Sequence, residues 1–128
     1  MRVVDTSAWI EALQGSQVGK LLGDELPAPS EWIVPTIVQL ELAKWARREA
    51  DPEKADQLIA FTTTCVVIDL TTAIALSAAA LCTEHKLATA EAIIYATAQA
   101  YEADLLTCDR HFENLPGVRF LPKPSPSL

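Results

Sequence analysis

The sequence predicts an α/β fold in which a mainly parallel sheet of four to five short strands is flanked by helices on both faces. Three observations support this fold class. Short β-branched runs alternate with segments of helical periodicity along the chain. Alanine and leucine are plentiful, so we expect more helix than strand. Half of the 128 residues are hydrophobic and only four are glycine, as is typical of one well-packed domain.

The N-terminal half predicts two strands and four helices. In chain order these are a strand at residues 2–4, helices at 8–13 and 17–22, a strand at 32–34, and helices at 36–49 and 51–61. Asp5, Thr6 and Ser7 carry side chains that can cap the first helix. Thr36 and Gln39 have the spacing of a capping box, which predicts the start of the third helix.

The C-terminal half predicts three strands and two helices. These are a strand at 65–68, helices at 71–85 and 89–102, and strands at 105–106 and 118–121. The residues at helical spacing are Val38, Leu42 and Trp45, which we expect to face the core, and Ile93, Ile94, Thr97 and Tyr101. We expect residues 1–121 to form a single domain and residues 122–128 to form a proline-rich tail.

The charge balance limits how the chain can bind nucleic acid. Aspartate and glutamate number 17 against 10 lysines and arginines, so the net charge is −7. This excludes the broad basic face with which many proteins hold nucleic acid. Any such contact must therefore be local or assisted by bound cations.

Cysteine usage and hydropathy indicate a cytoplasmic protein. The three cysteines lack C-x-x-C spacing, which argues against a disulfide framework and a zinc cluster and favours reduced thiols. Asp5 interrupts the first apolar run, so we expect no signal peptide. The longest small-apolar stretch, 73–82, is far shorter than the ~20 residues of a membrane span.

Four acidic residues stand where an open α/β sheet binds its ligands, beyond the carboxyl ends of the strands. Asp5 follows the first strand and Asp109 follows the fourth. Glu41 lies about one turn into the helix at 36–49, and Glu91 lies in the first turn of the helix at 89–102. All four have apolar neighbours in the sequence, which distinguishes them from acids expected to be solvated.

Crowded carboxylates require a cation. Two like charges ~4 Å apart repel by about 1 kcal/mol in water and by about 4 kcal/mol at an effective dielectric constant of 20. Mg²⁺ or Mn²⁺ removes this repulsion and can activate water for attack on a phosphodiester. Taken alone, an acid such as Asp109 is more often a helix cap or turn residue. The four together predict a metal site, whereas Asp24 and Glu25 are expected to be solvated.

Four motifs resemble those of the PIN-domain family, particularly of its VapC-type toxins. They are residues 3–11 (VVDTSAWIE), 34–43 with Val34-Pro35-Thr36 and Glu41-Leu42-Ala43, 90–98 (AEAIIYATA), and 106–112 (LTCDRHF) followed by Pro116-Gly117-Val118. They occur in the family's order and cover nearly the whole chain apart from the tail. No single motif is specific, but the four in sequence are.

The resemblance implies a PIN-domain-like fold and a Mg²⁺- or Mn²⁺-dependent endoribonuclease, the toxin of a VapBC-type pair in a type II toxin–antitoxin system. It places the catalytic and metal-binding roles on Asp5, Glu41, Glu91 and Asp109. Glu91 stands where the family usually has aspartate. Supporting roles, in which a hydroxyl orients a carboxylate or a water, fall on Thr6, Ser7 and Thr107. The implied partners are an RNA substrate, a cognate antitoxin and a second copy of the chain.

A small basic patch offers contacts for RNA phosphates. Glu41, Lys44 and Arg48 share one helical face, and Lys44, Arg47, Arg48 and Arg110 are the candidate cations. The alternative is a Glu41–Lys44 surface pair, with the other cations favoured by the helix C-terminus.

Other side chains keep two interpretations. Trp9 and Trp45 pack in the core or line a groove for an antitoxin helix. The alanine-rich face at 73–80 permits close helix packing within the domain or across a dimer. His85 and His111 lack metal-ligand spacing and are expected to be partly exposed, with a minor substrate contact as the alternative for His111, which lies two residues after Asp109.

Two other functions compete with the nuclease. A catalytically silent PIN-like module that binds RNA or a protein partner stays open because of Glu91. A receiver-type signalling domain requires a phosphorylatable aspartate and a nearby lysine. Asp69 is the only such aspartate, and no lysine is suitably placed after a later strand, which disfavours this class.

Overall fold

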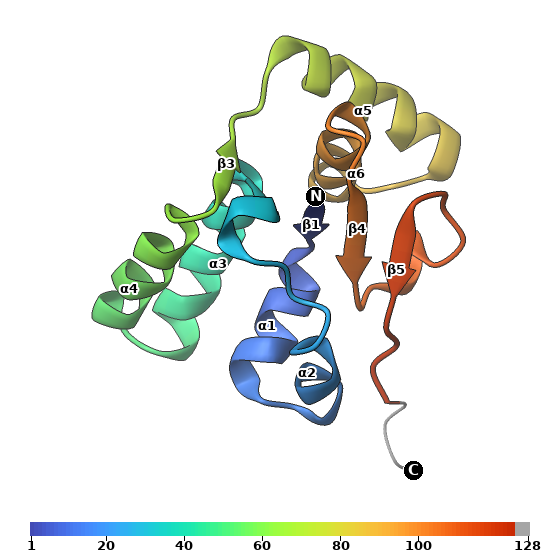
Figure 1. The fold of residues 1–128 in the computed structure, drawn as a ribbon. Coiled ribbons are helices and arrows are strands. Elements are labelled where there is room, and N and C mark those ends of the chain that lie inside the picture. Colours follow the sequence, from blue (N-terminus) through green and yellow to red (C-terminus); the bar gives the residue numbers. More distant parts are fainter. Residues whose placement is uncertain (125–128) are drawn as a thin grey trace.

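The computed structural model describes residues 1–124, which form a five-stranded parallel sheet flanked by helices (Figure 1). The strands are β1 (Arg2–Val4), β2 (Trp32–Pro35), β3 (Val66–Ile68), β4 (Asp104–Thr107) and β5 (Val118–Phe120). The helices are α1 (Thr6–Gln14), α2 (Gln17–Leu22), α3 (Thr36–Glu49), α4 (Pro52–Thr62), α5 (Thr72–His85) and α6 (Thr89–Ala100), with 3₁₀ turns η1 (Pro29–Glu31) and η2 (Arg110–Phe112). The predicted fold class is confirmed.

The sheet order, β3-β2-β1-β4-β5, places the site between two particular strands. All neighbouring strands are parallel. The chain moves outward from β1 to β3 and then crosses back to β4 on the other side of β1. Because crossovers between parallel strands are right-handed, this reversal sends the later helices to the opposite face. The carboxyl ends of β1 and β4 form the switch point, where open α/β sheets bind ligands.

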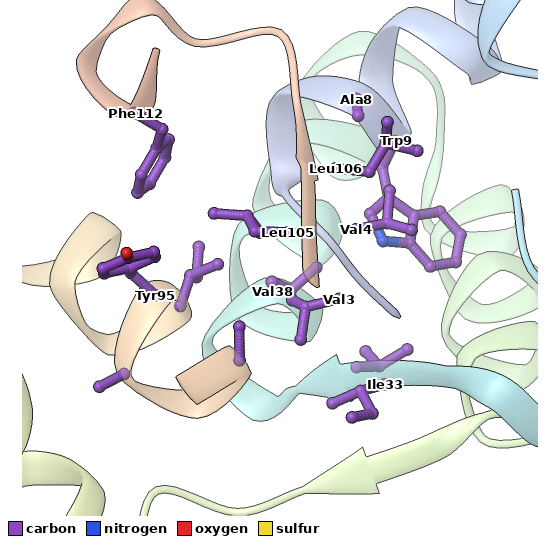
Figure 2. Packing of buried hydrophobic residues seen from close by; sticks show 14 of the residues in the cluster. Val3, Val4, Ala8, Trp9, Ile33, Val38, Tyr95, Leu105, Leu106 and Phe112 are labelled. Atoms are coloured by element: carbon purple, nitrogen blue, oxygen red, sulfur yellow. The ribbon is translucent and has the colours of Figure 1, made fainter. Parts of the chain in front are cut away.

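The core lies on both faces of β1 and β4. Val3 is in register with Leu105, and Val4 with Leu106, so successive side chains point to opposite faces. Figure 2 shows Val4 and Leu106 on the side of Trp9, and Leu105 on the side of Tyr95. The four strand residues are fully buried. Helices therefore cover the central strands from both sides, which holds the ends of β1 and β4 in place.

Ion pairs join β1 and β4 at their amino ends. The guanidinium of Arg2 donates to both carboxylate oxygens of Asp104, at 2.9 and 2.7 Å, and to Glu25 at 2.8 Å. Arg119 of β5 also donates to Glu25, at 2.8 Å. The bonds from Arg119 and Arg2 lower the pKa of Glu25 to about 2. The expectation that Glu25 is a solvated acid is therefore wrong: it connects the loop after α2 to the sheet.

Two of the predicted helix caps are wrong, although the helices themselves are present. Helix α1 begins at Thr6 rather than at Ala8, and Asp5 occupies the N-cap position without a side-chain capping bond, because hydroxyl groups bind its carboxylate elsewhere. Helix α3 begins at Thr36 as predicted, but its N-cap residue is Pro35. The Gln39 amide donates to Thr62 of α4 at 3.0 Å, so no Thr36–Gln39 capping box forms.

Helical spacing correctly predicted two of the three core positions of α3. Val38 and Leu42 are buried as expected, but Trp45 is only half-buried and Ala46 takes the third core position of α3. In α6, Ile94 and Thr97 are buried and Ile93 is partly buried, whereas Tyr101 follows the last residue of the helix, Ala100, and is 45% exposed.

The chain after β5 is exposed and has no regular structure at 122–124, and the rest of the predicted tail, 125–128, lies outside the described residues. The domain boundary at residue 121 stays a prediction. Within residues 1–124, no helix combines the length and the apolar character that a membrane span requires.

Adjacent leucines of α2 provide a matched test of this packing. Leu22 is fully buried, whereas Leu21 is 62% exposed. We expect Leu22→Ala to lower the free energy of unfolding by about 2–5 kcal/mol, because it removes buried methyl groups and leaves a cavity. Leu21→Ala should change it by less than about 0.5 kcal/mol. Urea unfolding of both variants measures this, and equal effects would contradict the packing described.

Candidate active site

The four acids named from the sequence line one hollow beyond the carboxyl ends of β1 and β4. We call it the acidic hollow; its volume is about 320 Å³. Its lining residues are Asp5, Thr6, Ser7, Glu41, Ala88, Ala90, Glu91, Ile94 and Asp109. They come from the β1–α1 junction, α3, the start of α6 and the turn after β4. Segments distant in sequence thus meet at the switch point of the sheet.

Asp5 is the deepest of these acids. It is only 5% exposed, and its backbone N–H donates to the carbonyl of Leu106 at 2.8 Å, which extends the β1–β4 pairing by one residue. Burial raises the pKa of the Asp5 carboxyl above its ordinary value. The negative charges of Asp109 and Glu41 raise that pKa further, while hydrogen bonds from Ser7 and Thr107 oppose the increase. The ionised carboxylate is therefore held under electrostatic strain.

Hydroxyl groups fix the orientation of Asp5. The Ser7 and Thr107 hydroxyls donate to its Oδ2, at 2.7 and 2.8 Å. The Ser7 oxygen also accepts the N–H of Cys108 at 3.1 Å, and the Thr107 oxygen accepts the N–H of Asp109 at 3.0 Å. These bonds connect the start of α1 to the end of β4, so the turn that carries Asp109 is tied to the same carboxylate.

Glu41 has its own hydroxyl partner. Thr6 donates to Glu41 Oε1 at 2.7 Å, which joins the first turn of α1 to the second turn of α3. The two side chains form one wall of the acidic hollow. Thr6, Ser7 and Thr107 each donate to a carboxylate of this site.

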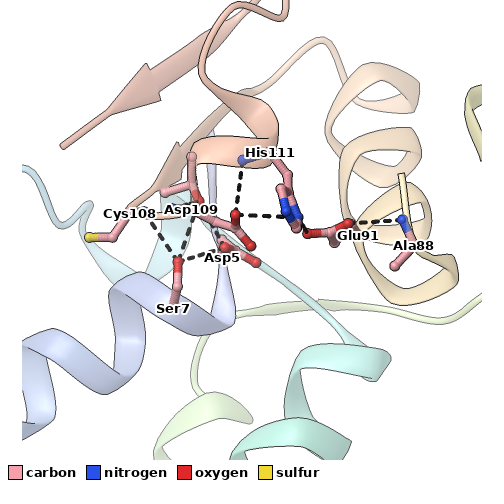
Figure 3. Close-up of polar contacts among 8 residues, drawn as sticks. Asp5, Ser7, Ala88, Glu91, Cys108, Asp109 and His111 are labelled. Atoms are coloured by element: carbon pink, nitrogen blue, oxygen red, sulfur yellow. Dashed lines mark hydrogen bonds and ion pairs between the residues drawn. The ribbon is translucent and has the colours of Figure 1, made fainter. Parts of the chain in front are cut away.

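Glu91 and Asp109 form a tight group with His111, as Figure 3 shows. Glu91 Oε2 lies 2.6 Å from His111 Nδ1, and its other oxygen accepts the N–H of Ala88 at 2.8 Å. Asp109 Oδ1 lies 3.5 Å from His111 Nδ1 and accepts the N–H of the same residue at 2.9 Å. The bond to Glu91 and the charge of Asp109 raise the pKa of His111.

The carboxylate oxygens of this site fit a hard divalent cation. One ligand atom each from Glu91, Asp109 and His111 lies within 4.8 Å of the others. Among the described residues, Asp5 and Glu41 line the same hollow without joining that tight group. Carboxylate oxygens are the ligands that Mg²⁺ and Mn²⁺ prefer, and a cation would relieve the strain on the buried Asp5.

His111 is the residue of this site that sequence reasoning did not assign to it. Its exposure was predicted correctly, since its side chain is 70% exposed. Its contact with Glu91, 20 positions earlier, depends on the 3₁₀ turn η2 that follows Asp109. The only available signal was its place two residues after that aspartate.

The four candidate basic residues lie in three different environments. Lys44 and Arg48 lie beside Glu41, in a smaller hollow next to the acidic one. Arg110 lies outside both hollows as residues 1–124 define them, with its guanidinium 5.6 Å from the centre of the Phe120 ring. Arg47 pairs with Asp56 at 3.9 Å. The predicted Glu41–Lys44 pair is not among the ion pairs of the described residues.

Comparisons with known proteins agree with this architecture. A toxin–antitoxin complex from Klebsiella pneumoniae contains a chain with 26% identity and a TM-score of 0.79, and the match covers 93% of this chain and 96% of that one. VapC20 from Mycobacterium tuberculosis, a toxin that cleaves the sarcin–ricin loop, has 19% identity, a TM-score of 0.74 and coverages of 92% and 97%. DNA-bound VapBC from Salmonella typhimurium has 18% identity, a TM-score of 0.71 and coverages of 94% and 96%.

VapC20 and VapBC from Salmonella typhimurium are only 19% and 18% identical to this chain, so these two similarities show a shared fold alone. No curated protein matches the sequence significantly. The family described as the PIN domain matches residues 2–118, which include every residue of the acidic hollow. The chain therefore belongs to the PIN domain family.

Proposed function

We propose that this chain is a metal-dependent endoribonuclease and the toxin of a VapBC-type toxin–antitoxin pair. One observation carries the proposal: four carboxylates line one hollow, and the deepest of them is buried. Membership of the PIN domain family and the likeness to chains of toxin–antitoxin complexes support it. The proposed nuclease domain comprises residues 1–121.

In this proposal Asp5, Glu41, Glu91 and Asp109 hold Mg²⁺ or Mn²⁺. When bound, the ion supplies neutralising charge for the phosphodiester and activates the attacking water. The hydroxyls of Thr6, Ser7 and Thr107 hold the carboxylates in fixed orientations. His111 is a positioning residue that holds Glu91 toward the hollow. Lys44 and Arg48 lie beside Glu41 and would hold RNA phosphates next to the metal site. Arg110 lies outside the two hollows, so it would contact a phosphate farther along the RNA.

The antitoxin would bind a different surface. A mainly apolar hollow of about 510 Å³ between α1 and α4 is lined by Trp9, Ala12, Leu13, Leu26, Trp32, Lys54, Gln57, Leu58 and Phe61. Leu13 and Phe61 are 48% and 41% exposed, and the apolar face of an amphipathic partner helix would cover them. The three free cysteines favour the cytoplasm as the place of action.

Asp5→Asn tests the nuclease directly. Purified, antitoxin-free protein should cleave a mixed RNA substrate with Mn²⁺ or Mg²⁺ and not with EDTA. Asp5→Asn should reduce this cleavage by at least about 100-fold, because one metal-binding charge is lost. Its melting temperature without metal should equal or exceed that of the wild type, since a strained buried charge has been removed.

Asp24→Asn is the matched control, because it makes the same change at an exposed aspartate. Mn²⁺ should raise the melting temperature of the wild type and of this control, but raise that of Asp5→Asn much less. A folded wild-type protein that cleaves none of several RNAs would favour the alternative, a silent PIN-like module that binds RNA or a protein partner.

Glu91 departs from the aspartate that the family resemblance implies, and two variants separate its charge from its length. Glu91→Gln should reduce cleavage by at least about 100-fold, because the carboxylate is lost. Glu91→Asp should keep cleavage within about tenfold of the wild type, because the negative charge remains. Any decrease within that range would come from loss of the contact with His111. Rates measured at saturating Mn²⁺ compare them. Equal activity of Glu91→Gln and the wild type would remove Glu91 from the site.

The exposed face of α5 is the surface we propose for a homodimer. This helix is apolar on most of its circumference, yet only Ile74, Ala78 and Leu81 are buried. Leu76 is 69% exposed, so we expect Leu76→Glu to convert a dimer into a monomer in light scattering. Leu21→Glu, at an exposed position of α2, should not. A wild type that is already monomeric at micromolar concentration would contradict the dimer.

A further inference from the structure

A second hollow adjoins the acidic one and contains an aromatic side chain. We call it the tryptophan hollow; its volume is about 210 Å³. Its lining residues are Thr6, Ile10, Glu41, Lys44, Trp45 and Arg48. Thr6 and Glu41 line both hollows, and a hydrogen bond of 2.7 Å joins them. These two side chains form the wall that separates the hollows. A chain bound across the acidic hollow can therefore continue over this wall.

We infer that the tryptophan hollow is a nucleotide subsite, in which Trp45 stacks on a base of single-stranded RNA next to the phosphodiester at the acidic hollow. This inference rests on the proposed nuclease function. It gives a ligand to a residue whose helical spacing predicts burial but whose ring is only partly covered.

The position of Trp45 suits stacking. Ala46 occupies the core position of α3 at this level, which leaves the indole half-buried at the surface. Trp9 and Trp32 differ from it, since they are 4% and 5% exposed and pack on each other with ring centres 4.5 Å apart. An aromatic side chain that is partly open to solvent can stack on any base, because every base has a π-face.

The cations of the hollow suit a phosphate backbone. Lys44 is exposed and forms no ion pair within residues 1–124. Arg48 pairs only with its neighbour Glu49, at 2.9 Å, and both side chains are more than half exposed, so the pair exchanges readily with solvent. Lys44 and Arg48 lie one and two helical turns beyond Glu41, so they offset the acidic total at the place where a polyanion would enter.

A single base fits the size of this hollow better than a protein segment does. Sites that enclose a drug-sized ligand are roughly 300–1,000 Å³, and this hollow is smaller. A partner helix would need a longer apolar groove, whereas here the apolar surface of Ile10 and Trp45 is bordered by charged side chains.

Two substitutions of Trp45 test the subsite. The binding of a fluorescent single-stranded RNA of mixed sequence is measured by anisotropy in EDTA, where no cleavage is expected, and KM and kcat are measured with Mn²⁺. Trp45→Leu should raise Kd and KM by roughly tenfold and leave kcat within about twofold. Trp45→Phe should restore most of the affinity, because it keeps an aromatic face. The Mn²⁺-induced rise in melting temperature should persist in both variants, since neither changes a metal-binding residue.

Lys44→Ala tests the phosphate contact, with Lys20→Ala of α2 as the matched exposed control. Lys44→Ala should weaken RNA binding and reduce the slope of log Kd against log salt by about 1, and the control should change neither.

The outcomes separate this inference from the proposed function. Cleavage by the wild type together with unchanged Kd and KM in Trp45→Leu would overturn the subsite and keep the nuclease; a hollow that receives a protein partner would give this result. Trp45-dependent RNA binding without cleavage would keep the subsite and overturn the nuclease. Failure of the wild type to bind the RNA would overturn the subsite.

Discussion

The parallel pairing of β1 with β4 is the constraint on which the site depends. At its amino end the bidentate contact of Arg2 with Asp104 fixes the register. At its carboxyl end the N–H of Asp5 binds the carbonyl of Leu106. A slip of one residue would exchange the two faces of the strand, so Val4 would leave its side of the core. The same register therefore determines both the packing of the sheet and the meeting of Asp5 with the turn after β4.

Burying Asp5 near other acids opposes folding, because each charge loses hydration and repels its neighbours. The hydroxyls of Ser7 and Thr107 offset part of this cost, since hydrogen bonds to an ionised group are stronger than neutral ones. These hydroxyls cannot cancel the repulsion of Asp5 by Asp109 and Glu41, because only a positive charge can neutralise it. Folding thus assembles an arrangement whose charge repulsion a bound cation would relieve.

The sequence predicted the strands and helices well, because these depend on local periodicity. It also brought the four acids to one place, since parallel strands end at one edge of the sheet, and their roles there stay a prediction. It did not predict details that depend on contacts between elements. Pro35 became the N-cap because β2 runs directly into α3. Gln39 binds Thr62 of α4 instead of its own helix end. His111 reaches Glu91 only through the orientation of η2, which no spacing of residues encodes.

The net charge of −7 sets a condition on any reaction with RNA. Charges are screened beyond about 8–10 Å at moderate salt, so a phosphate responds to the groups around it and not to the total. Within the acidic hollow that local charge is negative, and a phosphodiester would be repelled until cations bind there. Beside it, the positive charges of Lys44 and Arg48 line the tryptophan hollow, and under the proposal above they would attract phosphate without a metal. If the proposals hold, recognition of the backbone and binding of the reacting group would therefore have different metal requirements, because the two hollows lie on opposite sides of the Thr6–Glu41 hydrogen bond.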